Sequence, residues 1–171
     1  MELQTRNYPL IVTLELDKES KTYFNSMRKN YFPNHANYLD AHLTLFHHLP
    51  SNNHFIMDTL QGFIHKPCFR LTVSHLVNFE KGIAFNLHSE ELKELHTAMQ
   101  EAFDPFLKKH DKKPLWPHIT IQNNVTAFKA QRTLEILQQD FQPFEVVATG
   151  ISVWYYIGGP WRPNMFIPFR T

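Results

Sequence analysis

The segments His42-Leu43-Thr44-Leu45 and His118-Ile119-Thr120-Ile121 are two copies of one pattern, His-x-Thr-x, with an aliphatic residue at each x. Successive side chains of a β-strand point to opposite faces, so each histidine shares a face with its threonine. The aliphatic residues then face the other way. We therefore expect two strands, each with an imidazole and a hydroxyl on one face and with helices packed against the other.

The same order of elements surrounds both segments. Apolar periodicity and turn residues predict a strand, a helix, the His-x-Thr strand, a second helix and a third strand, twice over. His118 follows His42 by 76 residues (118 − 42). The first unit has predicted strands at 9–16, 42–46 and 68–77 and helices at 17–31 and about 52–64. The second has strands at 82–87, 118–121 and 144–157, helices at about 89–106 and 126–140, and a last strand near 165–169.

This duplication predicts an α+β fold. We expect a bilobal, pseudo-two-fold arrangement of duplicated strand-helix-strand-helix-strand units, with mostly antiparallel sheets lining a central cleft. The 171 residues suit a single domain, made of lobes at about 8–80 and 81–171. Equivalent residues of the two lobes can then meet in the shared cleft.

The balance of charged residues limits the classes of ligand that this chain is expected to bind. Lys+Arg 17 against Asp+Glu 16 gives a formal charge of +1, whereas proteins that grip long nucleic acids usually carry a basic stripe. We expect a small phosphate ligand or the end of an RNA, no membrane and a monomer. The N-terminus lacks the pattern of a signal peptide, and the single cysteine, Cys68, indicates a reducing cytoplasm.

The two motifs carry information through their context. With 11 histidines and 12 threonines, chance alone gives about 0.8 His-x-Thr matches, so the equivalent place of each motif in its unit is what matters. A neutral imidazole can take a proton from water while a protonated one gives a proton to a leaving ribose oxygen. Threonine hydroxyls can bond the phosphate oxygens. This set suits phosphodiester hydrolysis.

On these residues the chain resembles the 2H phosphoesterase superfamily, in particular its 2′-5′ RNA ligase-like, cyclic phosphodiesterase branch, over about residues 8–170. The resemblance implies metal-independent cleavage of ribose 2′,3′-cyclic phosphates or 2′-5′ linked nucleotides, reversible as ligation. His42, Thr44, His118 and Thr120 then are the catalytic residues, and no cofactor is implied. Several relatives have an arginine soon after the second motif, where this chain has Gln122-Asn123-Asn124.

Further residues are candidates for substrate binding. Some follow a motif at positions whose side chains should point to the same face as the motif histidine. Others lie on the cleft-facing side of another predicted strand, where an arginine could replace the missing cation. The last ones follow the Gly158-Gly159 turn and could line the edge of the cleft. They are Phe46, Gln122, Arg70, Trp154, Tyr156, Trp161 and Arg162. Structural packing or solvent exposure is the competing interpretation for each.

Two other functions fit the sequence. The same fold can act as a non-catalytic sensor of nucleotides or RNA ends, which would bind cyclic nucleotides without turnover. A cluster of histidines, His47, His48 and His54, suggests a metal protein, but it lacks the fuller ligand set of a zinc site. We therefore predict no metal.

Overall fold

A computed structural model describes residues 7–171 of the chain. The N-terminal segment in which no signal peptide is predicted lies mostly outside the described residues. None of the helices within 7–171 has the length and apolar character needed to cross a membrane.

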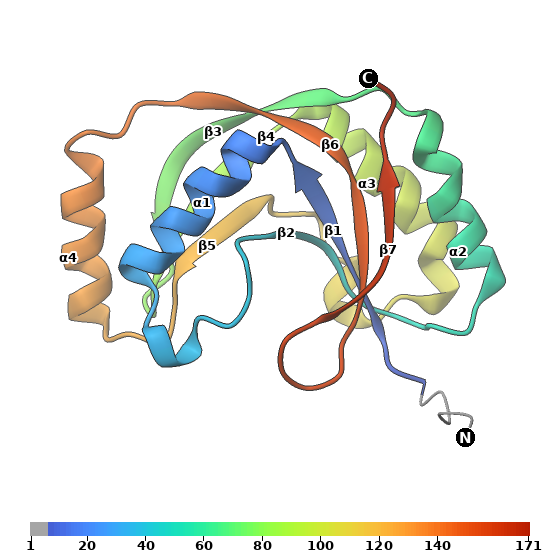
Figure 1. Cartoon of the computed structure of the whole chain (residues 1–171), viewed down its shortest axis with the longest axis horizontal. Helices are drawn as coiled ribbons and strands as arrows, with labels where there is room; N and C mark the ends of the chain where they lie inside the picture. The colour runs from blue at the N-terminus through green and yellow to red at the C-terminus, as the bar shows by residue number, and fades with distance from the viewer. Residues whose placement is uncertain (1–6) are drawn as a thin grey trace.

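One curled antiparallel sheet organises the chain (Figure 1). The strand order is β2-β1-β6-β3-β4-β5. Strand β7 pairs with the same edge of β6 as β3 does, further along the strand. The strands are β1 (Leu10–Leu16), β2 (Leu43–Leu49), β3 (Phe69–Asn78), β4 (Ile83–His88), β5 (His118–Gln122), β6 (Phe144–Tyr155) and β7 (Arg162–Pro168). The predicted mixed fold with a largely antiparallel sheet is confirmed.

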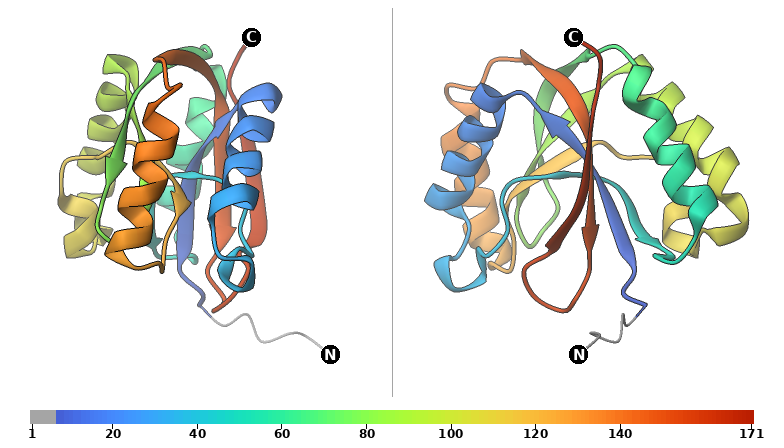
Figure 2. Two further views of the ribbon diagram at one scale, coloured as in Figure 1. Left: turned by 90° about the vertical axis from the view of Figure 1, so that its left-hand side faces the viewer. Right: turned by 45° about the vertical axis from the view of Figure 1, so that its right-hand side comes forward.

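Within residues 7–171, four helices cover the outside of the sheet in two pairs (Figures 1 and 2). They are α1 (Lys18–Tyr31), α2 (His54–Gln61), α3 (Glu90–Phe103) and α4 (Ala127–Gln138). In the first pair, Phe24 of α1 packs edge-on against Phe85 of β4, and α4 contacts β3 and β4. In the second pair, His96 of α3 bonds to β2, and α2 lies beside α3. Short 3₁₀ turns at Asn34–Ala36, Gly62–His65, Asp104–Phe106 and Lys109–Lys112 complete the chain.

The two repeated units exchange elements. The last strands of the units, β3 and β6, pair with each other at the centre of the sheet. Each also pairs with the first strand of the other unit, β3 with β4 and β6 with β1. Helix α1 lies against β4 and β5, and α3 against β2. Each lobe is thus built from both halves of the chain, and the predicted division into lobes at about 8–80 and 81–171 is wrong in this respect. Strands β2 and β5 are the outer strands that curl toward each other.

Local sequence explains where the helices begin and end. Asp17, Ser89 and Thr126 each accept a hydrogen bond from the amide three residues later, as N-caps do. Helix α2 is capped by Asn53, whose side chain accepts a hydrogen bond from the Ile56 amide. Helix α3 ends at Phe103 because Pro105 cannot continue it.

The turn between β3 and β4 generates a stability prediction. A Cβ at Gly82 would overlap the carbonyl oxygen of Gln122, whereas Gly62 has open space around its Cα. Gly82→Ala should lower the free energy of unfolding by more than about 2 kcal/mol, because backbone atoms must move. Gly62→Ala, whose backbone is already helical, should change it by less than about 1 kcal/mol. Denaturant unfolding of both variants tests this, and equal stability would contradict the close approach.

Candidate functional site

The threonines of the two motifs lie on the concave face of the sheet. Thr44 is directly opposite Thr13 of β1, and Thr120 is opposite Ala84 of β4. The alternate residues, Leu43, Leu45, Ile119 and Ile121, are at most 2% exposed and pack toward the helices. The predicted division of each motif into a polar and an apolar face is confirmed. Strands β2 and β5 also contact one another, so the two polar faces adjoin.

Each motif histidine is held in the same way. The Nδ1 atom of His42 lies 2.7 Å from the carbonyl oxygen of Asp40, and that of His118 lies 2.7 Å from the carbonyl oxygen of Trp116. A carbonyl only accepts, so Nδ1 carries the proton in both rings. The other nitrogen, Nε2, is then the one with a free lone pair in the neutral ring. Both imidazoles are thereby prepared to accept or deliver a proton at Nε2.

Burial and neighbouring charge make the two imidazoles unequal. Burial lowers the pKa of His42 to about 4, and the charges of Arg28, His118 and His47 add to the effect against the hydrogen bond to Asp40. Burial also lowers the pKa of His118, with His47 contributing and the hydrogen bond to Trp116 opposing. In the free protein His42 is therefore neutral across the physiological range.

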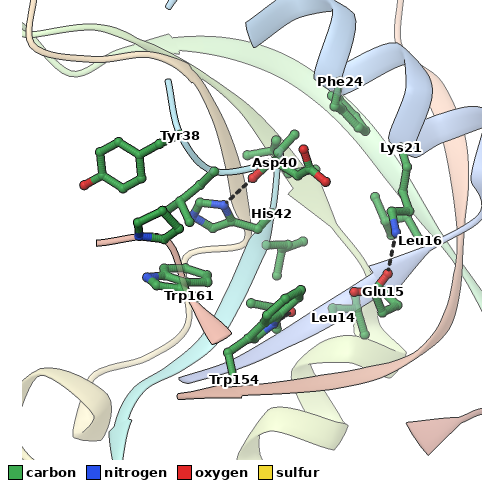
Figure 3. A pocket seen from close by; sticks show the side chains of 16 residues that line it. Leu14, Glu15, Leu16, Lys21, Phe24, Tyr38, Asp40, His42, Trp154 and Trp161 are labelled. Carbon is green, nitrogen blue, oxygen red and sulfur yellow. Dashed lines mark hydrogen bonds and ion pairs between the residues drawn. The ribbon is translucent and has the colours of Figure 1, made fainter. Parts of the chain in front are cut away.

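A pocket of about 240 Å³ opens beside His42 (Figure 3). Its aromatic side holds Tyr38, Trp154 and Trp161, and the Trp161 ring centre is 4.6 Å from that of His42. Its other end holds the ion pair of Lys21 with Glu15, at 3.1 Å. The placement of Trp154 and Trp161 agrees with the sequence-based prediction, and the Trp154 indole donates to the Thr13 hydroxyl at 2.9 Å.

Phe46 and Gln122 lie on the wrong side of the sheet for substrate contact, contrary to prediction. Both are 0% exposed. Register shifts, between Val12 and Thr13 on β1 beside β2 and between Ile83 and Ala84 on β4 beside β5, interrupt the alternation after each motif. Phe46 therefore stacks on His96 in the core, with ring centres 4.8 Å apart. Gln122 donates instead to the Thr133 hydroxyl of α4.

Six other predicted residues lie outside this pocket: the motif residues Thr44, His118 and Thr120, and three candidates for substrate binding. Arg70 is exposed and pairs with Glu145 at 3.1 Å, so its charge is already partnered. Tyr156 follows the end of β6, and its amide donates to the Pro9 carbonyl. Arg162 begins β7 and is exposed. None of the three lines the pocket that contains His42.

Two residues beside the motifs were not predicted from the sequence. Trp116 stacks on His118 with ring centres 3.8 Å apart, and its indole donates to Asn86 at 2.8 Å. Arg28 of α1 is only 4% exposed and donates to the Thr120 carbonyl and to Asn37, each at 3.0 Å. Trp116 was detectable, because it lies two residues before His118. Arg28 gave no signal, since its partner is 92 residues away.

The irregular part of β2, where its register with β1 shifts, is held by a side chain that was not predicted. The buried carboxylate of Asp111 accepts the amides of His47 and His48 at 2.9 Å, and the His47 ring lies 3.2 Å from it. Burial opposes the charge on Asp111, but hydrogen bonds from His47 and His48 prevail and hold its pKa below the usual value. His47, His110 and Asp111 are metal-capable side chains gathered in one place, whereas His48 and His54 are not part of that group.

Comparison with known proteins identifies the family. The profile of the 2′-5′ RNA ligase superfamily matches residues 16–160. The chain belongs to the 2′-5′ RNA ligase superfamily. This confirms the resemblance to 2H phosphoesterases that rested on the two motifs. A comparison with curated proteins gave no match.

Solved structures share the superfamily fold. LigT of Escherichia coli in complex with 3′-AMP aligns with a TM-score of 0.62 at 16% identity, covering 97% of this chain and all of LigT. LigT in complex with NADP⁺ gives 0.60 at 18% identity, with 97% and 100% coverage. The protein TT0787 of Thermus thermophilus gives 0.64 at 14% identity, with 95% and 98% coverage. At these identities the likeness establishes the fold alone.

The lowered pKa of His42 predicts a pH dependence of stability. Its folded pKa of about 4 lies below the ordinary 6.5, so between these values the unfolded chain binds the proton more tightly. Stability should therefore fall as pH falls from 6.5 to 4, and the fall should be shallower in His42→Gln. Denaturant unfolding across this range measures the slope. An NMR titration midpoint near 6.5 for the His42 ring would contradict the assignment.

Proposed function

We propose that this superfamily member is a phosphodiesterase that opens ribose 2′,3′-cyclic phosphates or cleaves short 2′-5′ linked nucleotides. The observation that carries the proposal is the matched pair of imidazoles, each with Nδ1 tied to the carbonyl two residues earlier and Nε2 left for proton transfer. Paired acid–base groups of this kind suit displacement at a phosphodiester. We also expect the protein to act in the cytoplasm.

His42 is the candidate general base. Its lowered pKa keeps it neutral, so Nε2 can take a proton from water as the water oxygen bonds to phosphorus. His118 is the candidate acid, because its ring lacks the direct influence of Arg28 that acts on His42. An anionic phosphate bound between the rings raises the pKa of His118 and so favours its protonated form. That proton passes to the ribose oxygen as its bond to phosphorus breaks.

Thr44 and Thr120 are candidates for holding the non-bridging oxygens. Each shares the concave face with its histidine, and a β-branched side chain has few rotamers. Their hydroxyls can donate to oxygens on which charge grows in the transition state. These groups account for every proton transfer, so the proposed reaction requires no metal.

The aromatic side of the pocket supports a nucleotide substrate. Tyr38, Trp154 and Trp161 offer flat apolar surfaces next to His42, and bases stack on such surfaces. The solved LigT complexes contain 3′-AMP, ATP and NADP⁺, all nucleotides. A nucleoside with its ribose phosphate at His42 and its base among these rings is the arrangement we propose.

Replacement of either motif histidine tests the reaction. His42→Ala and His118→Ala should each lower turnover of 2′,3′-cyclic mononucleotides by about 10²–10⁴-fold with the fold retained. His48→Gln, an exposed neighbour, is the matched control and should retain activity. A screen with cyclic mononucleotides, ADP-ribose cyclic phosphate and 2′-5′ dinucleotides, scored for the ribose position that keeps the phosphate, identifies the substrate. Turnover should persist in EDTA; loss of activity there would refute the mechanism.

Binding without turnover by the wild-type protein would instead favour a sensor of nucleotides or RNA ends. The same substrates titrated calorimetrically distinguish the two functions.

The pocket generates a separate prediction about affinity. Trp161→Ala removes a ring beside His42 without touching either Nδ1 hydrogen bond. We expect KM to rise about tenfold while kcat changes less than about threefold, because a stacking contact contributes about 1–3 kcal/mol. Steady-state kinetics on the best substrate measure both constants. A loss confined to kcat would show that Trp161 positions the histidine and does not bind the base.

A further inference from the structure

Three metal-capable side chains come together where β2 meets the 3₁₀ turn Lys109–Lys112. His110 and Asp111 are neighbours in this turn, and His47 comes from β2. One ligand atom from each lies within 4.8 Å of the others. The rings of His47 and His110 are nearly perpendicular, with centres 4.4 Å apart. Segments separated by 64 residues are thus joined at one point.

Asp111 is fixed before any ligand binds. Its side chain is 1% exposed, and both of its oxygens accept amide hydrogens of β2. Hydrogen bonds that orient a carboxylate in this way support metal ligands in proteins. The His47 side chain is 51% exposed, and His110 is exposed, so both imidazoles can turn toward an ion that arrives from solvent.

A purely structural role, in which Asp111 holds the irregular part of β2, explains its hydrogen bonds with the His47 and His48 amides. It does not explain why His110 lies beside His47. We propose that His47, His110 and Asp111 form a site for a divalent transition-metal ion of the zinc class. Two imidazole nitrogens and one carboxylate oxygen are donors that zinc accepts at about 2.0–2.2 Å, leaving a position for water. Such donors would lie about 3.4 Å apart around a tetrahedral ion, a distance that rotation of the exposed rings can reach.

A bound ion would replace the hydrogen that lies between His47 Nδ1 and Asp111 Oδ1. His47 Nδ1 and Asp111 Oδ1 are 3.2 Å apart and share a hydrogen in the metal-free protein. Coordination at Nδ1 moves the remaining ring proton to Nε2 or releases it to solvent, since a ligating imidazole must offer a lone pair. The carboxylate needs no deprotonation. Magnesium and calcium prefer all-oxygen ligands and are excluded by the two nitrogens.

Occupancy has a consequence for the neighbouring motif histidines. His47 lies on β2, the strand that directly follows His42 and that contacts β5, the strand of His118, and its charge lowers the pKa of both motif histidines. Two positive charges on the metal, less one on Asp111, place a net positive charge at this rim. A cation there disfavours protonation of the general acid, so the ion acts as an inhibitor. This inhibitory role rests on the proposed function, whereas metal binding does not.

Calorimetric titration of the tag-free, EDTA-stripped full chain with ZnCl₂ tests the site directly. We expect one equivalent to bind, and His110→Gln to weaken binding by at least about tenfold. His110 is exposed and its side chain is not among the groups proposed for catalysis, so this variant should fold and retain turnover. His48→Gln is the matched control and should bind as the wild type does. Equal affinity in wild type and His110→Gln would overturn the proposal.

A second measurement protects against misfolded variants. His47→Gln and Asp111→Asn should also lose the zinc equivalent, and circular dichroism shows whether each is folded. Cobalt(II) added to the wild-type protein should give a visible absorption spectrum that His110→Gln lacks. If binding is confirmed, zinc should slow wild-type turnover and spare His110→Gln. Zinc binding without any turnover in the wild type would refute the phosphodiesterase and leave the metal site standing.

Discussion

The antiparallel pairing of β3 with β6 is the constraint on which the rest of the structure depends. Because these strands end the two repeated units, their pairing sends each unit's last strand beside the first strand of the other. The His-x-Thr strands are thereby left at the outer positions of the curled sheet, where β2 and β5 approach each other. The two His-x-Thr patterns come side by side only through this exchange.

The site then depends on features outside the motifs. Carbonyls two residues before each histidine set the same tautomer in both rings. The surroundings break this symmetry, since the charge of Arg28 acts on His42 but not on His118, while Trp116 stacks on His118. A duplicated scaffold thus provides two equivalent imidazoles, and unique side chains give them different proton affinities.

Local sequence was sufficient for the elements, their order and the two faces of each motif. Alternation identified Leu43 and Ile119 as apolar-face residues, and the helices that Ser89 and Thr126 cap begin where the apolar periodicity placed them. The placement of Phe46 failed because a bulge leaves no signature in a run of residues that suits either face. The exchange of strands was equally hidden, since a strand has no local preference between two similar partners. Contacts such as that of Arg28 with Thr120, 92 residues apart, exist only after the sheet has closed.

The exchange also governs the order in which the chain can fold during synthesis. Strand β1 is synthesised before its partner β6, which follows about 130 residues later. The hydrogen bond that Ser152 donates to Glu15 joins residues 137 apart. Leu10, Ile11 and Val12 are buried in the finished protein, so until β6 emerges they expose an apolar edge. Until β6 is made, this unpaired strand edge favours association with other chains.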